Sequence, residues 1–354
     1  MESLLWFLLT LLIACISGTI ASRLGVPAGR MIGAMLGVAV LNLATGQAYM
    51  YPVLRTAVQI CLGVMSGYRV GRSELKNMLK LIVPIFFMLL ICLTLNIFFG
   101  IVILKITSLD IGTALLSITP GGATDMVFVA SDIGADTGMV GLLQSLRMIY
   151  CNSVLPMFFV AVINRKDAKH APMRQPDKTS AAVSPYCKSS CKLLAMFTIA
   201  ACGGLLFKRI GVPGGALVGA LIFTAAFTCF WGKTKYPEGM KHTQQFLSGA
   251  YIGTSITRAT VLSIPSILPA VAVILADIMV YVFLMAFVLG KVSNMDYGTR
   301  MLCSTPGGIG EATILSEELG TDTATVAAMN TVRMILVVAT FPTIITWLSR
   351  FLGR

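Results

Sequence analysis

The chain has 354 residues, of which 56% are hydrophobic and only 12% are charged, and its mean hydropathy is +0.85. A soluble domain carries about twice that share of charged residues, so the composition excludes a soluble protein and predicts one that crosses a membrane several times. The net charge of +12 does not indicate a nucleic-acid partner, because the basic residues lie in loops between apolar segments and have no interleaved aromatic residues.

Eight apolar segments are long enough to cross a bilayer as helices, or to cross most of it. In chain order they are Leu4–Ala21, Met31–Leu43, Leu81–Leu104, Met139–Ile163, Leu193–Phe207, Ala216–Phe230, Ile264–Leu289 and Thr323–Leu348. Two more polar candidates, Pro52–Val70 and Thr243–Thr257, contain glycines four residues apart. Small residues at that spacing let membrane helices approach closely, so we expect these segments to pack tightly.

Most of the chain is a tandem duplication with a fixed offset. Thr-Pro-Gly-Gly at 119–122 recurs at 305–308, and 305 − 119 = 186. The same offset relates Gly25 to Gly211, Arg72 to Arg258, Asp136 to Asp322, Arg147 to Arg333 and Pro156 to Pro342. The duplication predicts a membrane repeat at 1–163, a linker at 164–192 and a second membrane repeat at 193–354.

The linker 164–192 is predicted to face the cytoplasm, because it contains seven basic residues and only two acidic ones. The turn with Arg23 and Arg30 and the loop that begins with Arg72 are also basic, so they belong on the same side. A polytopic protein with this bias is expected in the lipid bilayer of a bacterial inner membrane.

Each Thr-Pro-Gly-Gly sequence is predicted to break a helix. In the first repeat the break separates Ile111–Ile118 from Ala123–Ile133, and both are far shorter than the roughly 20 residues that a membrane helix needs. We therefore expect a re-entrant hairpin beside about five crossings in each repeat. Since five is odd, the second repeat is expected to be inverted relative to the first, as in many secondary transporters.

The two breaks are predicted to form a substrate site. Backbone without hydrogen-bond partners is tolerated at membrane depth only inside protein or beside a water-filled cavity, and each glycine pair lets a ligand approach the amides at a helix start. The alternative is that each motif only makes a turn. The predicted binding groups are the hydroxyls of Thr119 and Thr305 and the amides of Gly121, Gly122, Gly307 and Gly308.

Two arginines are expected deep in the membrane. Arg147 lies eleven residues beyond Asp136, which places it about 16 Å along a helix, and Arg333 is its counterpart. A buried arginine requires a partner, which can be the acid of the hairpin or an anionic substrate. Gln144 and Asn330 lie one turn earlier on the same helix faces and extend this polar site.

Three carboxylates are candidates for coupling transport to H⁺ or Na⁺. Asp125 and Glu311 lie in the first turn after each break, where capping of the helix is the alternative explanation. Asp277 lies in the middle of an apolar segment and has no counterpart in the first repeat. Asp132, Glu318, Asp136 and Asp322 lie at hairpin ends and helix starts, where capping is the expected role. With only two histidines in the chain, no metal centre or other cofactor is expected.

The duplicated T-P-G-G-x-x-[D/E] motif, followed by G-[A/T]-D and a helical arginine, resembles the AbrB-type duplicated bacterial membrane proteins. The resemblance covers nearly the whole chain and does not concern the small soluble DNA-binding protein of the same name. The family is often labelled as ammonia monooxygenase, and one branch is described as a regulator of gene expression. The first copy in this family commonly has Glu where Asp125 stands here.

The sequence predicts an all-helical, multi-pass secondary transporter. It would move a small solute, which one version of the hypothesis takes to be an anion, by alternating access, with the binding site between the two breaks. The alternative is a membrane-embedded sensor that affects gene expression indirectly through the basic linker, as the resemblance implies. An enzyme is not expected, because the chain offers no evident nucleophile and base, and the histidines that a monooxygenase centre requires are absent. The sequence is compatible with a homo-oligomer and offers no segment for direct nucleic-acid binding.

Overall fold

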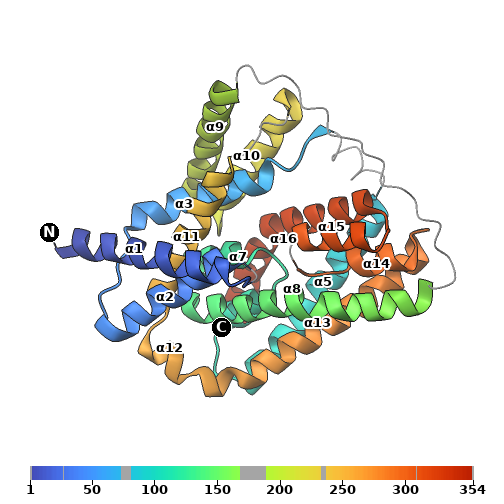
Figure 1. Cartoon of the computed structure of the whole chain (residues 1–354), viewed down its shortest axis with the longest axis horizontal. Helices are drawn as coiled ribbons and strands as arrows, with labels where there is room; N and C mark the ends of the chain where they lie inside the picture. The colour runs from blue at the N-terminus through green and yellow to red at the C-terminus, as the bar shows by residue number, and fades with distance from the viewer. Residues whose placement is uncertain are drawn as a thin grey trace.

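The computed structural model describes residues 2–26, 28–72, 81–167, 189–232, 237–307 and 309–352, and the regular elements among them are all helices (Figure 1). The predicted linker 164–192 lies largely outside these residues. The helices of the first half are α1 Glu2–Arg23, α2 Gly29–Thr45, α3 Pro52–Gly67, α5 Ile82–Ile106, α6 Ile111–Ile118, α7 Ala123–Ile133 and α8 Thr137–Asp167. Those of the second half are α9 Ser189–Ile210, α10 Gly215–Trp231, α11 Glu238–Ser255, α12 Arg258–Leu262, α13 Ile264–Val292, α14 Tyr297–Cys303, α15 Ile309–Glu318 and α16 Thr323–Leu352.

Four helices in the described part of the chain begin at an aspartate that caps them. In each case the carboxylate accepts a hydrogen bond of 2.9–3.1 Å from the backbone amide three residues later, which satisfies one of the unpaired donors of the first turn. The capping residues are Asp110 at α6, Asp136 at α8, Asp296 at α14 and Asp322 at α16. The capping role predicted for Asp136 and Asp322 is confirmed.

Among the described residues, five helices are long and apolar enough to cross a membrane: α1, α5, α9, α13 and α16. Two shorter apolar helices, α2 and α10, have 17 residues each. By contrast, α6 has 8 residues and α7 has 11, so at 1.5 Å per residue they extend only about 12 Å and 16 Å. The predicted break between them is present at its predicted position, and neither piece can cross a bilayer alone.

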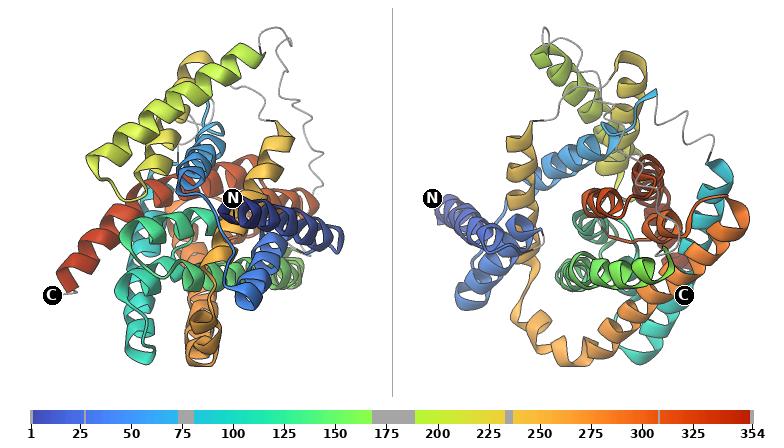
Figure 2. Two further views of the ribbon diagram at one scale, coloured as in Figure 1. Left: turned by 90° about the vertical axis from the view of Figure 1, so that its left-hand side faces the viewer. Right: turned by 45° about the vertical axis from the view of Figure 1, so that its right-hand side comes forward.

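The helices pack in two groups. The frame helices are α1, α2 and α3 together with α9, α10 and α11, and within this group α2 packs on α11 and α3 packs on α10. The core helices are α5 to α8 together with α13 to α16, with α5 packed on α13 and each short hairpin packed on α8 or α16. Figure 2 shows both groups from two further sides. Each group therefore combines segments from both halves of the chain.

Glycines bring the frame helices into backbone contact. A Cβ atom on Gly249 of α11 would lie 2.4 Å from the Met31 carbonyl oxygen of α2, and one on Gly63 of α3 would lie 2.4 Å from the Leu217 carbonyl oxygen of α10. Both neighbours are backbone atoms in packed helices, which cannot move aside cheaply. The close packing predicted from the glycine spacing is thus confirmed at these two contacts.

Replacing Gly249 by Ala is therefore expected to separate α2 from α11 and to destabilise the protein by about 1–3 kcal/mol. Thermal unfolding of the detergent-solubilised protein would measure this as a lower midpoint. Gly239→Ala on the same helix is the matched control, since a Cβ there meets nothing within 4 Å. Equal midpoints for the two variants would contradict the proposed contact.

Candidate functional site

The first helix break exposes a cluster of backbone carbonyl groups. Helix α6 ends at Ile118, Thr119 has an extended backbone with φ −54° and ψ 122°, and α7 begins only at Ala123. Pro120 has no N–H to continue the α6 hydrogen bonds, and it also holds the residue before it away from helical geometry. The last carbonyls of α6 therefore require donors from elsewhere in the protein.

Arg147 of α8 supplies several of these donors. Its Nη1 donates to the carbonyl oxygens of Ile118, at 3.2 Å, and of Thr119, and its Nη2 donates to that of Gly121 at 2.8 Å. Arg147 as a whole is only 4% exposed. A planar cation with several N–H groups fits the negative, carbonyl-rich end of a helix, so the arginine holds the break in its irregular shape.

Two side-chain amides complete the support of the break. Gln144, one turn before the arginine, donates from Nε2 to the carbonyl oxygens of Leu116, at 2.6 Å, and Thr119, at 3.1 Å. Asn96 of α5 donates from Nδ2 to the carbonyl oxygen of Leu115, at 3.1 Å, and to Oγ1 of Thr119, at 3.0 Å. The Thr119 hydroxyl in turn donates to the Leu115 carbonyl and is fully buried, so in this structure it is engaged within the protein.

The second break is supported in the same way. Arg333 of α16 donates from Nη1 to the Thr305 carbonyl oxygen and from Nη2 to that of Gly307 at 3.4 Å. Asn330 donates from Nδ2 to the carbonyl oxygen of Leu302 at 3.2 Å. Arg333 is 2% exposed and is among the largest fully buried side chains of the described residues.

The partners that the sequence suggested for the arginines were an acid of the hairpin or an anionic substrate. The structure adds a third partner, the carbonyl groups of the breaks, which accept three hydrogen bonds from Arg147 and two from Arg333. The Nε of each arginine is buried without a hydrogen-bond partner. Among the described side chains, the oppositely charged groups that approach within 4.0 Å are those of Arg55 and Asp132. Neither buried arginine takes part in this ion pair.

The candidate coupling carboxylates are placed differently from one another. Asp125, 3% exposed, lies in the first turn of α7 with its carboxylate against Gly122, so closely that a Cβ on this glycine would collide with it. Asp277 is 8% exposed and lies on α13. Glu311 lies on α15, but its side chain is outside the described part of the structure, as is the whole of Gly308.

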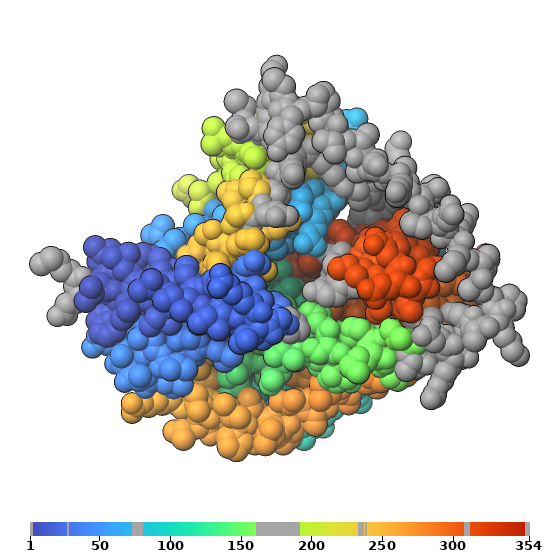
Figure 3. All heavy atoms as spheres, in the orientation of Figure 1, coloured from blue at the N-terminus to red at the C-terminus, as the bar shows by residue number. Residues whose placement is uncertain are grey.

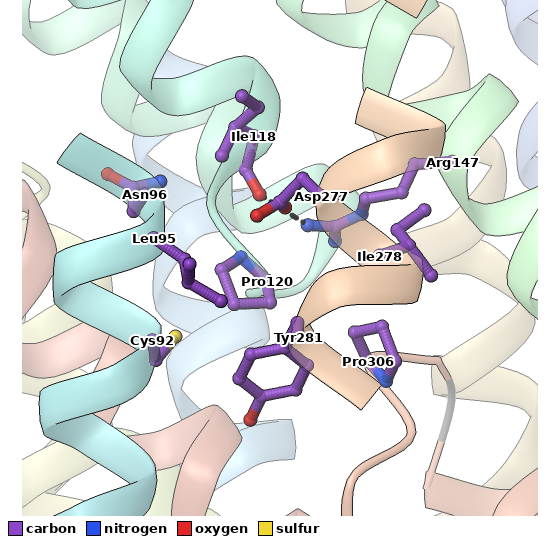
Figure 4. Close-up of a pocket in the computed structure, with 10 residues that line it drawn as sticks. All are labelled: Cys92, Leu95, Asn96, Ile118, Pro120, Arg147, Asp277, Ile278, Tyr281 and Pro306. Carbon is purple, nitrogen blue, oxygen red and sulfur yellow. Dashed lines mark hydrogen bonds between the residues drawn. The ribbon is translucent and has the colours of Figure 1, made fainter. Parts of the chain in front are cut away.

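A narrow cavity connects Asp277 to both breaks. Figure 4 shows Asp277 and Arg147 directed toward the same space, which Pro120 from the first break and Pro306 from the second also line. Tyr281, one turn beyond Asp277 on α13, lies on the same wall (Figure 4). The structure thus brings together segments that are 186 residues apart in the sequence.

A larger cavity of about 540 Å³ lies between the core and the frame helices. Its core wall includes the two breaks, the two buried arginines and Asn152 of α8. Its frame wall includes Arg30 of α2, Arg69 just beyond α3 and Gln245 of α11. Figure 3 shows the hollow near the centre of the molecule, between the dark-blue α1–α2 segment and the red segments of the second half. Its size matches that of a small-molecule site.

The charged residues that line this cavity, among those described, are all positive. Four arginines line it (Arg30, Arg69, Arg147 and Arg333), and its described lining contains no Asp or Glu. An enclosed positive surface beside polar backbone attracts an anion, and Arg30 and Arg69 reach it from the frame while Arg147 and Arg333 reach it from the core. Arg30, Arg69 and Asn96 were not among the predicted site residues. For Asn96 the available signal was a polar side chain within the apolar segment Leu81–Leu104.

These features define a helical membrane protein with a polar, positively charged cavity at two helix breaks. A family model described as "Transition state regulatory protein AbrB" matches residues 1–163 and 39–349, so the chain belongs to this family. The resemblance inferred from the repeated motif is thereby confirmed.

Two relatives cover nearly the whole chain. The "Uncharacterized protein YhjN" of Bacillus subtilis (strain 168) is 25% identical over 359 residues, which cover 96% of this chain and 91% of the relative. The "Putative regulator AbrB" of Escherichia coli (strain K12) is 23% identical over 357 residues, which cover 99% and 98% of the two chains.

Because the arginines hold the breaks, Arg147→Met and Arg333→Met are expected to destabilise the protein even without ligand. Each change leaves buried carbonyl groups without a donor, at about 1–3 kcal/mol for each unpaired group. Thermal unfolding in detergent measures the effect. Arg258→Met is the control, because Arg258 is exposed although it also donates to a backbone carbonyl, that of Leu43 at 3.3 Å. Wild-type stability in both buried variants would show that the breaks do not depend on the arginines.

Proposed function

We propose that this protein is a secondary transporter that moves a small anionic solute across the bacterial inner membrane by alternating access. The observation that carries the proposal is the cavity of about 540 Å³ between two helix groups, which is lined by both helix breaks and by four arginines. Broken helices beside a polar cavity are the usual site of substrate binding in such transporters.

The proposed protein has two inverted repeats, each with five crossings and a re-entrant hairpin. The sequence offset of 186 residues supports this arrangement, and the helix bounds agree with it: α2 and α10 begin at Gly29 and Gly215, and α8 and α16 begin at Thr137 and Thr323. The odd number of crossings supports the inversion. In this topology Arg30 faces the cytoplasm, so the large cavity opens inward.

Within this proposal the solute binds at the Thr-Pro-Gly-Gly breaks. The amides of Gly122, Gly307 and Gly308 contact its anionic group, since glycine allows close approach to a helix start. The amide of Gly121, which the sequence also suggested, instead donates to the Thr119 carbonyl oxygen at 2.8 Å in this structure. The arginines Arg30 and Arg69 attract the anion from the frame side. Asp277, Asp125 and Glu311 are the proposed sites for a coupling H⁺ or Na⁺.

We propose transport rather than catalysis, because the described lining of the large cavity holds no histidine, cysteine or carboxylate that would act as nucleophile or base. A second candidate is a membrane sensor that binds the same anion and regulates gene expression indirectly. The family description and the name of the Escherichia coli relative favour it. A sensor would bind the anion saturably and would not release it on the far side.

Uptake into liposomes of phosphatidylethanolamine and phosphatidylglycerol tests the proposal. With the purified protein inserted, at least one of radiolabelled acetate, succinate, citrate, phosphate or sulfate is expected to accumulate above the level of protein-free liposomes. Arg69→Gln should reduce the initial rate at least tenfold, because it removes a cavity charge. Arg72→Gln, three residues away and outside the cavity, is the matched control.

The same assay identifies the coupling ion. An inward H⁺ or Na⁺ gradient should stimulate uptake, and Asp277→Asn should remove this stimulation, whereas Asp136→Asn should not, since asparagine also caps a helix. Saturable binding of one of these anions without accumulation would instead support the sensor. Neither binding nor uptake of any of them would contradict an anion site.

Single cysteines at two capping positions test the inverted topology. Asp136→Cys and Asp322→Cys are introduced separately into a variant without the nine native cysteines. A membrane-impermeant thiol reagent should reach the first from the periplasmic face and the second from the cytoplasmic face. Labelling of both from one face would mean parallel repeats and would remove the main support for alternating access.

A further inference from the structure

Asp132 is the most heavily bonded acidic side chain among the described residues. It forms an ion pair with Arg55, accepts a hydrogen bond of 3.0 Å from Nε2 of Gln59, and accepts one of 3.1 Å from the backbone amide of Gly214. The helix-capping role expected from the sequence is therefore wrong for Asp132. Its carboxylate instead satisfies three donors outside its own helix.

These contacts join the two helix groups. Asp132 lies in the last turn of α7, a core helix, whereas Arg55 and Gln59 lie on α3 and Gly214 is the N-cap residue of α10, both of which are frame helices. A charge-assisted contact with three donors is strong, because the carboxylate is both paired and hydrogen-bonded. This cluster, which we call the Asp132 latch, fixes the first hairpin to the frame.

Each residue of the latch has a counterpart 186 positions away, in the opposite half of the chain. Adding 186 to 55, 59 and 132 gives Lys241, Gln245 and Glu318, and subtracting 186 from 214 gives Ala28. The chemistry corresponds as well: a cation and an amide on α11, an acid at the end of α15 and the N-cap residue of α2. We call these four residues the Glu318 set.

The Glu318 set is apart in this structure. Among the described side chains, no hydrogen bond or ion pair within 4.0 Å joins Glu318 to Lys241 or Gln245, and Glu318 is exposed. The side-chain oxygen of Gln245 is buried without a hydrogen-bond partner. Gln245 and Ala28 line the large cavity. Two of the four residues therefore lie where the cavity separates the core from the frame.

The backbone of Ala28 supports this correspondence. Ala28 has φ 52° and ψ 32°, close to the φ 65° and ψ 18° of Gly214 at the corresponding position. Among the described residues it is the one non-glycine residue with positive φ, and this conformation costs an alanine about 1–2 kcal/mol. Gly214 has the same conformation, and its backbone amide donates a hydrogen bond to the Asp132 carboxylate. Residues held in unfavourable backbone conformations often have a functional reason.

We propose that Asp132 and Glu318 are two alternating latches that decide which side of the membrane the cavity faces. In the present state the Asp132 latch is closed and the cavity is open beside the Glu318 set. In the opposite state Glu318 binds Lys241, Gln245 and the Ala28 amide, the Asp132 latch opens, and the cavity faces the other side. This inference rests on the proposed alternating access and names the contacts that control it.

Paired cysteines in the cysteine-free variant test the proposal. The first pair is Arg55→Cys with Asp132→Cys, and the second pair, made separately, is Lys241→Cys with Glu318→Cys. Each pair is treated with a short bifunctional thiol cross-linker. A further cysteine on the cavity wall, Met65→Cys, then reports whether an impermeant thiol reagent can enter the cavity. Cross-linking the first pair should leave the reporter reactive from the cytoplasmic side. Cross-linking the second pair should lower its labelling at least tenfold.

The pair Arg55→Cys with Glu318→Cys is the matched control, since these positions belong to different latches and should not cross-link. A second pair that never cross-links, or that cross-links and leaves the reporter fully reactive, would overturn the proposal. Removal of one latch charge at a time gives an independent measurement. Asp132→Asn opens the closed latch and should lower labelling of the reporter at least threefold. Glu318→Gln changes a latch that is already open and should not lower it.

The outcome is separable from that of the transport proposal. Uptake of an anion without protection of the reporter by the second cross-link would leave transport standing and remove the latches. Protection of the reporter by the second cross-link without uptake of any anion would leave two alternating states and remove the transport function.

Discussion

The structure depends on hydrogen bonds to backbone carbonyl groups, because a carbonyl without a donor is unfavourable in an apolar environment. Thr-Pro-Gly-Gly interrupts a helix twice, and each interruption leaves carbonyls that water cannot satisfy in a membrane. Arg147 and Arg333 donate to them from neighbouring long helices. This contact explains how a charged side chain that is 4% or 2% exposed is stable, and how an irregular segment keeps one shape.

The supported breaks become the wall of a cavity. The arginines hold carbonyl groups of each break, and the same breaks line a space to which four arginines give a positive charge. In the proposed function the same two side chains would combine structural support with attraction of an anion, whereas Arg30 and Arg69 contribute charge from the frame. The separation of the cavity into a core wall and a frame wall is what makes relative movement of the two groups a reasonable mechanism.

The two halves of the chain are similar in sequence but differ in their contacts. Asp132 joins its hairpin to the frame through three donors, while its counterpart Glu318 is exposed and joined to none of the corresponding side chains. In the mechanism proposed above, the present structure is one of two related states, and the other state exchanges the closed and the open contacts between the halves. The left-handed backbone of Ala28 is consistent with a position shaped for the second state.

The sequence alone determined the features that follow from local rules: the apolar helices, the break between Ile118 and Ala123, the caps at Asp136 and Asp322 and the 186-residue offset. These depend on neighbours within a few residues or on direct repetition. Only the tertiary structure decided which donors meet the break carbonyls, that Asp132 bonds to the frame, and that Arg30, Arg69 and Asn96 contribute to the site. Those contacts join segments far apart in the chain, so their formation depends on how the helices pack and not on local sequence.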